Sequence, residues 1–284
     1  MGAWSLDCAS PSTSDRFSTD QKSPSRVACS RKTLIFVRHG QSEYNLALQE
    51  TGRDPLIRDA PLSARGREQA RAAKEVLSRL QADFEAKVPS GRARWLLAVS
   101  PLRRALDTAS EVWPGASFGV GVGEQDGRGG GPANVRFEVL AGLREVMCSC
   151  ADLGSTPADL LRCYPHLERQ LSALPQVWWT VPPQLSALPP EGEAMRESYA
   201  SCPDAWEAAE EAALDERLVD LVEVRLAEAP EELVVIVAHC NLIRCLTRKL
   251  GLTEQGEGWI LKNCECRAAE GVELRTVAER AHCR

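Results

Sequence analysis

Short apolar runs that end in polar residues constrain the fold of this chain most. Residues 34–37 (Leu-Ile-Phe-Val) run directly into Arg38, His39 and Gly40. Similar runs cover residues 95–99, 135–140 and 233–238. Apolar runs of this length, rich in branched residues, are typical of buried strands. We therefore expect four strands, each of which delivers polar side chains at its carboxyl end.

Helical patterns alternate with these runs. Ser63 is a candidate N-cap for a helix whose apolar residues recur three or four positions apart, at Ala70, Ala73, Leu77, Leu80 and Phe84. Further helices are expected over residues 101–113, capped by Ser100, over residues 203–229, before Pro230, and over residues 241–250, before Gly251. The alternation predicts an α/β fold, a three-layer sandwich in which helices cover both faces of a mainly parallel sheet. Residues 264–267 and 272–277 are expected to form a terminal hairpin.

The polar residues that follow the strands suit phosphoryl chemistry. Open α/β sheets place their ligands at the carboxyl ends of the strands. There the guanidinium of Arg38 can bind phosphoryl oxygens while the imidazole of His39 attacks phosphorus. Arg104 and Glu145 follow the second and third runs, and His239 directly follows the fourth. The alternatives are structural: histidines buried at strand ends, and a Glu145 that pairs with its neighbouring arginine at the surface.

Together these segments resemble the histidine phosphatase superfamily, also called the phosphoglycerate-mutase-like family. The resemblance is to the branch marked by Arg-His-Gly-x-Ser-x-x-Asn, which this chain carries at residues 38–45. Other matching segments are residues 62–70, 100–109 and 143–145 and the segment that begins at His239. They occur in the family's order across residues 33–270.

The resemblance implies a role for each residue of the site. It implies a phosphohistidine on His39, phosphoryl oxygens bound by Arg38 and Arg104, and Glu145 as the general acid. His239 would add a third positive group if its ring is cationic. The resemblance also implies phosphate contacts from Asn45 and from the backbone near Cys240 and Asn241. The family usually has glycine where this chain has Cys240. We expect no metal and no cofactor, because two arginines and a histidine supply the positive charge that a metal supplies elsewhere.

We expect a metal-independent phosphatase that hydrolyses a small phosphomonoester. The first alternative is phosphoryl transfer of the phosphoglycerate-mutase type. Mutases of this family follow the acid with an Arg-His-Tyr-Gly-like segment, whereas this chain has Val146-Met147-Cys148-Ser149. The second alternative is a catalytically silent module that only binds phosphate. The presence of the whole set of candidate catalytic residues argues against it.

Composition limits the remaining choices. The 284 residues are 44% hydrophobic, enough for one domain with a sizeable core. A net charge of -6 argues against nucleic acid or an anionic membrane as a partner, because both select basic surfaces. The chain has 11 cysteines, an odd number, and no apolar leader of the secretory type is expected at its start. We therefore expect reduced thiols in an intracellular, cytoplasmic protein. The sequence does not indicate an oligomeric state.

Three segments are expected to lie outside the core of the domain, which spans residues 33–284. Residues 1–32 are rich in serine and predict a disordered extension, with a transit peptide as the alternative. Residues 119–131 are rich in glycine and predict a flexible insertion. Residues 146–202 predict a substrate cap.

Two expectations concern cysteines. The pairs Cys148/Cys150 and Cys264/Cys266 lack the spacing of a zinc knuckle, so no zinc site is expected. Cys240 stands beside His239, and the favoured interpretation is an inert buried thiol. The alternative is a thiol whose pKa is lowered by nearby positive charge, which would make it sensitive to oxidation.

Overall fold

A computed structural model describes residues 30–88, 94–114, 135–191, 193–253, 256–276 and 278. Its strands are β1 (Ser30–Arg38), β2 (Trp95–Val99), β3 (Val135–Val139), β4 (Leu233–Ala238) and β5 (Cys266–Leu274). They form a sheet in the order β3-β2-β4-β1-β5. The first four strands run parallel and β5 pairs antiparallel with β1 at the edge. The mostly parallel sheet confirms the predicted α/β class.

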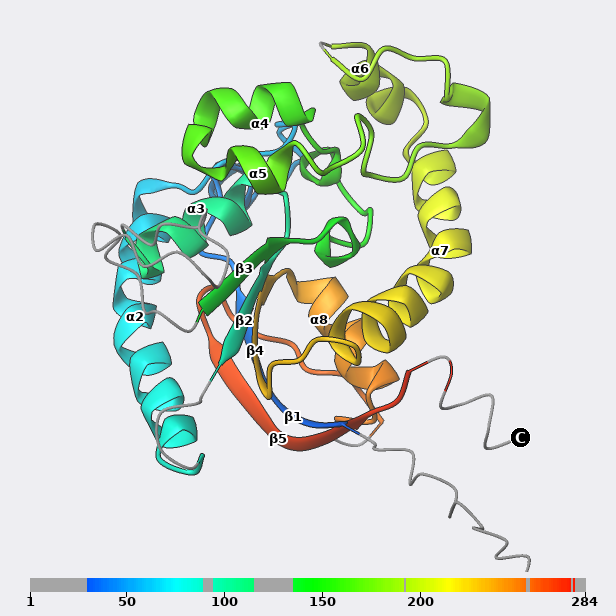
Figure 1. The fold of residues 1–284 in the computed structure, drawn as a ribbon. Helices are drawn as coiled ribbons and strands as arrows, with labels where there is room; N and C mark the ends of the chain where they lie inside the picture. Colours follow the sequence, from blue (N-terminus) through cyan, green and yellow to red (C-terminus); the bar gives the residue numbers. More distant parts are fainter. Residues whose placement is uncertain are drawn as a thin grey trace, which may run out of the picture.

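Helices cover both faces of the sheet, as predicted (Figure 1). On one face lie α2 (Ala64–Glu85) and α3 (Arg103–Val112); on the other lie α7 (Pro203–Val219), the π-helical segment η5 (Asp220–Leu226) and α8 (Cys240–Lys249). Alternate strand residues serve the two cores: Ile35 packs with α2 and α3, whereas Phe36 packs with η5 and α8. Both side chains are fully buried. This explains why the strands read as continuous apolar runs.

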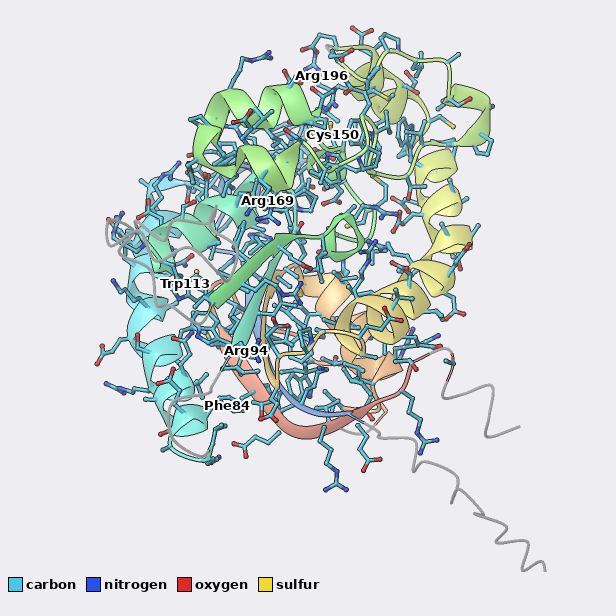
Figure 2. All side chains as sticks on the ribbon, in the orientation of Figure 1. Phe84, Arg94, Trp113, Cys150, Arg169 and Arg196 are labelled. Atoms are coloured by element: carbon cyan, nitrogen blue, oxygen red, sulfur yellow. The ribbon has the colours of Figure 1, made fainter. Side chains whose placement is uncertain are left out.

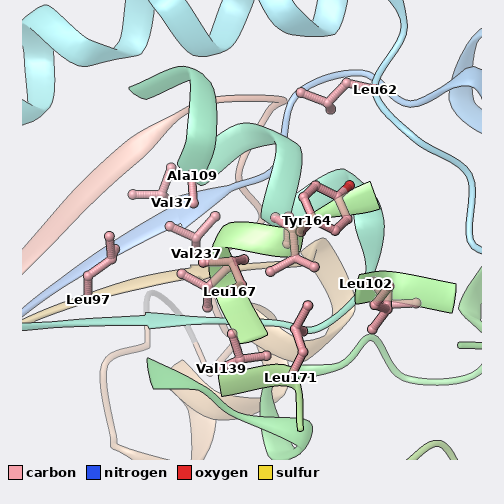
Figure 3. Close-up of a cluster of buried hydrophobic side chains, with 14 of the residues drawn as sticks. Val37, Leu62, Leu97, Leu102, Ala109, Val139, Tyr164, Leu167, Leu171 and Val237 are labelled. Atoms are coloured by element: carbon pink, nitrogen blue, oxygen red, sulfur yellow. The ribbon is translucent and has the colours of Figure 1, made fainter. Parts of the chain in front are cut away.

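Figure 3 shows the first of these cores at the carboxyl end of the sheet. Val37 and Val237 come from the central strands, and Ala109 comes from α3. Tyr164 and Leu167 reach the same cluster from the segment that follows β3. Complete burial of a valine or leucine side chain contributes about 1.5–3 kcal/mol. Packing therefore fixes this segment over the strand ends.

The predicted cap lies beyond the sheet, where α4, α5 and α6 are labelled in Figure 1. Its helical pieces are η2 (Cys150–Asp152), α4 (Pro157–Cys163), η3 (Pro165–Leu167), α5 (Glu168–Leu171), η4 (Pro183–Leu185) and α6 (Ala194–Ser201). Figure 2 places Cys150 and Arg196 in this region, far from Arg94 and Phe84 at the other end of the sheet. The cap therefore stands at the end of the sheet where the polar residues follow the strands.

The helix signals were mostly correct. Ser63 caps α2 as predicted, because its hydroxyl accepts a hydrogen bond from the Gly66 amide at 3.1 Å. Gly251 takes the left-handed conformation expected after α8, with φ 72°. The helix expected over residues 203–229 is α7 continued by the π-helical η5.

The start of α3 corrects one prediction. The helix begins at Arg103 and Ser100 does not cap it. Instead, the Asp59 carboxylate accepts a hydrogen bond from the Arg103 amide at 2.8 Å, so a residue distant in sequence takes the capping role. The Ser100 hydroxyl contacts a histidine ring, as described below.

The C-terminal strand corrects a second prediction. The expected hairpin is one strand, β5, that continues through both of its arms. Gly271 has φ 66°, and the register with β1 shifts between Lys32 and Leu34 at this point. An extra residue there, with glycine in the left-handed conformation, makes a β-bulge rather than a turn.

The boundary of the N-terminal extension also moves. Residues 30–32 belong to β1, so the predicted extension over residues 1–32 is wrong for its last three residues. Residues 1–29 and the glycine-rich segment 119–131 lie outside the described residues. In the described part of the chain, no helix has both the length and the apolar composition to cross a bilayer.

Candidate active site

The His39 ring lies at the carboxyl end of β1 and is only 3% exposed. Its Nδ1 is 2.6 Å from the carbonyl oxygen of Gly40. A carbonyl oxygen can only accept, so the proton is on Nδ1 and the lone pair is on Nε2. The Arg104 Nε–H donates to this Nε2 at 3.3 Å. Burial, with the charges of Arg104 and Arg38, holds the pKa of His39 well below its usual range.

Close backbone packing fixes the turn that carries this ring. A Cβ atom on Gly40 would lie 2.5 Å from the Gly66 carbonyl oxygen, so the turn and the start of α2 can meet only because both residues are glycine. The Gly40 amide donates to the Thr108 hydroxyl on α3 at 3.0 Å. The turn is therefore held from two helices, and the glycines of two separate motifs have one structural cause.

The second histidine stands at the end of β4. The His239 ring is fully buried, and its centroid is 5.0 Å from that of His39. Its Nε2 is 2.7 Å from the Ser100 hydroxyl. That hydroxyl already accepts from the Leu102 amide at 3.3 Å, so its own hydrogen is available to Nε2. The His239 Nδ1 is then the protonated atom, and it is buried with no hydrogen-bond partner among the described residues.

The role of His239 as a third positive group depends on the charge of its ring. Burial, followed by the positive charge of Arg104, holds the pKa of His239 well below its usual range. The ring is therefore neutral near pH 7 in the ligand-free protein, not cationic. A low-dielectric pocket that already contains guanidinium groups disfavours a further positive charge.

Arg104 connects the first strand to the cap. Its Nη1 donates to the Ala151 carbonyl oxygen and its Nη2 to the Asp152 carboxylate, each at 2.7 Å. The side chains of Arg104 and Asp152 are 5% and 3% exposed. Asp152 was not predicted as a site residue, because it lies in the cap without a motif. The only sequence signal was an acid seven residues after Glu145.

Arg38 is the last residue of β1. Its Nη1 donates to the Leu261 carbonyl oxygen at 2.8 Å. Its Nε is buried and has no hydrogen-bond partner among the described residues. The loop before β5 holds the end of β1, since the Cys264 amide donates to the Arg38 carbonyl oxygen at 3.0 Å. No sequence pattern indicated Leu261 as a site residue, because it contributes only a backbone atom.

Glu145 is buried at the amino end of α8. Its carboxylate accepts hydrogen bonds from the amides of Val146 at 2.9 Å, Leu242 at 2.8 Å and Asn241 at 3.2 Å. Burial, with the negative charge of Asp152, raises the pKa of Glu145 to about 7. The amide hydrogen bonds and the Arg104 charge oppose this rise. The carboxyl group is therefore divided between its protonated and ionised forms near neutral pH.

The surface alternative for Glu145 is wrong. Its neighbour Arg144 pairs with Glu210 on α7, at 3.3 Å, and donates to the Thr180 hydroxyl at 2.7 Å. Arg217 pairs with the same Glu210 at 2.5 Å and donates to the Arg144 carbonyl oxygen at 2.8 Å. This second buried charge cluster fixes the backbone beside Glu145 to α7.

The other predicted phosphate contacts, from Asn45, Asn241 and Cys240, differ in whether their donors are available. The Asn45 side chain accepts from the Ser42 amide at 3.2 Å as part of the capping box of α1 (Glu43–Thr51), which leaves its Nδ2 without a partner among the described residues. The Asn241 amide is bound to Glu145, so it is not available to a phosphate in this structure. The Cys240 amide makes no hydrogen bond within the described ranges.

The structure bears on the two expectations for the cysteines, a reactive or inert Cys240 and the absence of a zinc site. Burial raises the pKa of the Cys240 thiol, which argues against the alternative of a thiol activated by nearby positive charge. The Arg38 charge acts in the expected direction but is the smaller effect. No group of three or more His, Cys, Asp or Glu residues in the described part of the chain is arranged to hold a metal ion.

Comparison with known proteins gives a match over part of the chain. A curated glucosyl-3-phosphoglycerate phosphatase from Mycolicibacterium vanbaalenii is 42% identical over 78 residues, which are 28% of this chain and 28% of that protein. The chain thus matches under a third of that relative's length.

Solved structures are also similar. A mycobacterial glucosyl-3-phosphoglycerate phosphatase in complex with VO3 has a TM-score of 0.42 and 24% identity, over 86% of this chain and 95% of that chain. A protein from an open reading frame of Mycobacterium tuberculosis has a TM-score of 0.42 and 19% identity, over 86% of this chain and 96% of that chain.

The family match covers the first half of the candidate site. The sequence profile of the histidine phosphatase superfamily (branch 1) matches residues 34–122. This range includes Arg38, His39 and Arg104 but not Glu145 or His239, and it is shorter than the resemblance over residues 33–270 suggested. Residues 34–122 are thus similar to the histidine phosphatase superfamily (branch 1), over less than half of the chain.

Proposed function

We propose that this protein is a phosphatase that hydrolyses a small phosphomonoester through a phosphohistidine on His39. One observation carries the proposal: the hydrogen bond from Nδ1 to the Gly40 carbonyl oxygen fixes the tautomer and leaves the Nε2 lone pair beside Arg104. A nucleophilic histidine needs this arrangement, because the nitrogen that attacks phosphorus must be unprotonated. When substrate binds, Arg104 Nε transfers its hydrogen bond from Nε2 to a phosphoryl oxygen, which frees the lone pair.

Unpartnered buried donors support a phosphoryl group as the ligand. Arg38 Nε and His239 Nδ1 are buried without partners among the described residues. An unsatisfied buried polar group costs about 1–3 kcal/mol, so a ligand rich in acceptor oxygens removes that cost when it binds. A phosphoryl group between the two histidines can accept from these donors and from Arg104. Its negative charge also favours protonation of His239.

Glu145 completes the two steps. In the first, His39 Nε2 forms a bond to phosphorus, the bond from phosphorus to the ester oxygen breaks, and Glu145 gives its proton to the leaving alkoxide. In the second, the Glu145 carboxylate takes a proton from water, the water oxygen attacks phosphorus, and the phosphorus–nitrogen bond breaks to release inorganic phosphate. A carboxyl group with its pKa raised to about 7 can serve in both forms near neutral pH.

The name of the curated relative favours a small sugar or glycerate phosphate ester as substrate. It does not favour a mutase, and nor does the segment Val146-Met147-Cys148-Ser149 after the acid. A mutase must keep its phosphohistidine from water and bind a second acidic group. In the cap, Arg162 is exposed and paired with Asp159, so it is not directed toward the site.

A panel of phosphomonoesters tests the proposal. The purified full chain, assayed with a chelator present, is expected to release inorganic phosphate from several small esters. Bisphosphoglycerate is expected to give no stimulation, and 2- and 3-phosphoglycerate are not expected to interconvert. Isomerisation that outpaces phosphate release would show a mutase. Failure to hydrolyse any ester, together with tight binding of inorganic phosphate, would favour the silent binding module.

A further inference from the structure

Asp152 reaches the candidate site from the cap, and its contacts go beyond the family's motifs. Its Oδ1 accepts from Arg104 Nη2, and the adjacent Ala151 carbonyl oxygen accepts from Arg104 Nη1, both at 2.7 Å. Two consecutive residues of η2 thus hold the two ends of one guanidinium. The third nitrogen, Nε, faces His39 Nε2 at 3.3 Å. The plane of the Arg104 guanidinium is therefore set by the cap.

Asp152 is itself held rigidly. Its Oδ2 accepts from the Cys148 amide at 3.1 Å and from the Ser149 hydroxyl at 2.9 Å. With its side chain 3% exposed, the carboxylate has little space to change rotamer. A long arginine side chain has many rotamers of its own, and fixed acceptors on both Nη atoms select one of them.

The Asp152 charge also acts on Glu145. Burial and the Asp152 charge both raise the pKa of Glu145. The other titratable or charged groups that act on Glu145 are Arg104 on α3, Arg217 on α7, and the thiols of Cys148 and Cys240. Arg104 opposes Asp152, and the two thiols are neutral because burial raises the pKa of each. Asp152 is thus the group in this set whose negative charge favours a protonated Glu145.

We propose that Asp152 is a positioning residue that aims Arg104 at the phosphoryl group and keeps a proton on Glu145. The inference rests on the proposed function, because the phosphoryl group is its substrate. Through Asp152 the cap acts on both steps that precede the phosphohistidine: binding of the phosphoryl oxygens and protonation of the leaving group. Asp152 touches neither the substrate nor the transferred group, so it acts through Arg104 and Glu145.

The first test measures the Glu145 carboxyl in the ligand-free full chain. Carbon NMR of side-chain-labelled glutamate, with Glu145→Gln to assign the signal, gives its titration midpoint. Asp152→Asn removes the charge with little change of shape and is expected to move the midpoint to lower pH by about 1 unit or more. Asp152→Glu retains the charge and is expected to leave the midpoint close to the wild-type value. The matched control is Asp159→Asn, a cap aspartate whose ion pair with Arg162 lies at the surface; it is expected to change nothing.

The second test measures the aim of Arg104. With an aryl phosphate, whose leaving group scarcely needs a proton, both Asp152→Asn and Asp152→Glu are expected to lower kcat by about 10- to 100-fold, because each misplaces Arg104. With an alkyl phosphate, Asp152→Asn is expected also to move the basic limb of kcat/KM to lower pH, since Glu145 loses its proton earlier. Asp152→Glu is expected to leave that limb in place.

The outcomes separate the two proposals. If the wild-type chain hydrolyses no phosphomonoester, the proposed function is wrong whatever the titration of Glu145 shows. If the wild type is active, a Glu145 midpoint or an aryl kcat that stays at the wild-type value in Asp152→Asn overturns the role of Asp152 alone. Should Asp152→Asn fail to fold by circular dichroism, Asp152→Glu decides: an aryl kcat equal to wild type then overturns the proposal.

Discussion

The ends of β1 and β4 carry the two histidines of the candidate site, and they differ in how each ring is held. His39 bonds to a carbonyl oxygen, which permits one tautomer only. His239 bonds to the Ser100 hydroxyl, which can either donate or accept, and its other nitrogen is unpartnered among the described residues. The same kind of position therefore yields two chemical roles. A ring with a fixed tautomer suits a nucleophile, and a ring with a variable partner suits a donor whose charge changes when ligand binds.

The largest expected effect is the loss of the His39 side chain. His39→Ala is expected to lower phosphomonoesterase kcat by at least about 10⁴-fold, because no other group supplies the nucleophile. The near- and far-ultraviolet circular dichroism spectra should match wild type, because His39 follows the end of β1 and the core residues of that strand are unchanged. The exposed His166, in the cap, provides the control, and His166→Ala is expected to be fully active. Substantial activity in His39→Ala would contradict the assignment of the nucleophile to the end of β1 and of a donor to the end of β4.

Replacement of the acid at the β4 end should depend on the leaving group. Glu145→Gln is expected to slow alkyl phosphates by about 10²- to 10⁴-fold and aryl phosphates by less than about tenfold. For alkyl esters the wild-type kcat/KM should fall as pH rises through about 7, because the protonated form is the acid. Initial rates across a series of leaving groups measure both effects. Equal losses on all esters would show that Glu145 acts only by fixing α8.

His239→Ala should have a smaller effect than His39→Ala. Removal of one donor to a transferring phosphoryl group is expected to lower kcat by about 10²- to 10³-fold. The phosphohistidine should still form on His39, only more slowly, and single-turnover kinetics will measure this. If loss of His239 is as severe as loss of His39 and no phosphoenzyme forms, the two rings act as one unit and the comparison fails.

The smallest expected effect is the uptake of a proton by His239 when an anion binds. Burial and the Arg104 charge depress the pKa of His239 in the ligand-free protein, and a bound anion raises it again. Binding of sulfate, whose own charge is constant near pH 7, is therefore expected to take up as much as about one proton per site. Calorimetry in buffers of different ionisation enthalpy measures this number. His239→Gln should reduce the uptake, whereas release of protons by the wild type would contradict the predicted direction.

The sequence predicted those parts of the molecule that depend on local patterns. The strand ends at His39 and His239 and the helix after Ser63 were correct, because apolar runs and capping residues act within a few positions. The alternation of strand and helix patterns also indicated the fold class, since strands buried on both faces must be covered by helices.

Contacts between distant segments were not predictable. Ser100 fits the pattern of a helix cap, but its hydroxyl is used by His239, and Asp59 caps α3 instead. A hairpin was expected from residues 264–267 and 272–277, but pairing with β1 makes them one strand with a bulge at Gly271. Asp152 has no periodic pattern or motif around it and gains its importance only because the cap brings it to Arg104. The charge state of His239 depends on burial, which no local pattern determines.

Trapping of the intermediate tests the central claim most directly. Wild-type protein is mixed with a fast aryl phosphate, quenched within one turnover under alkaline conditions that preserve phosphohistidine, and digested for mass spectrometry. We predict phosphate on His39, lost on brief acid treatment and absent from His39→Gln. Phosphate on a serine or on His239, or burst-phase turnover with His39 unmodified, would contradict the assignment of the nucleophile to the end of β1.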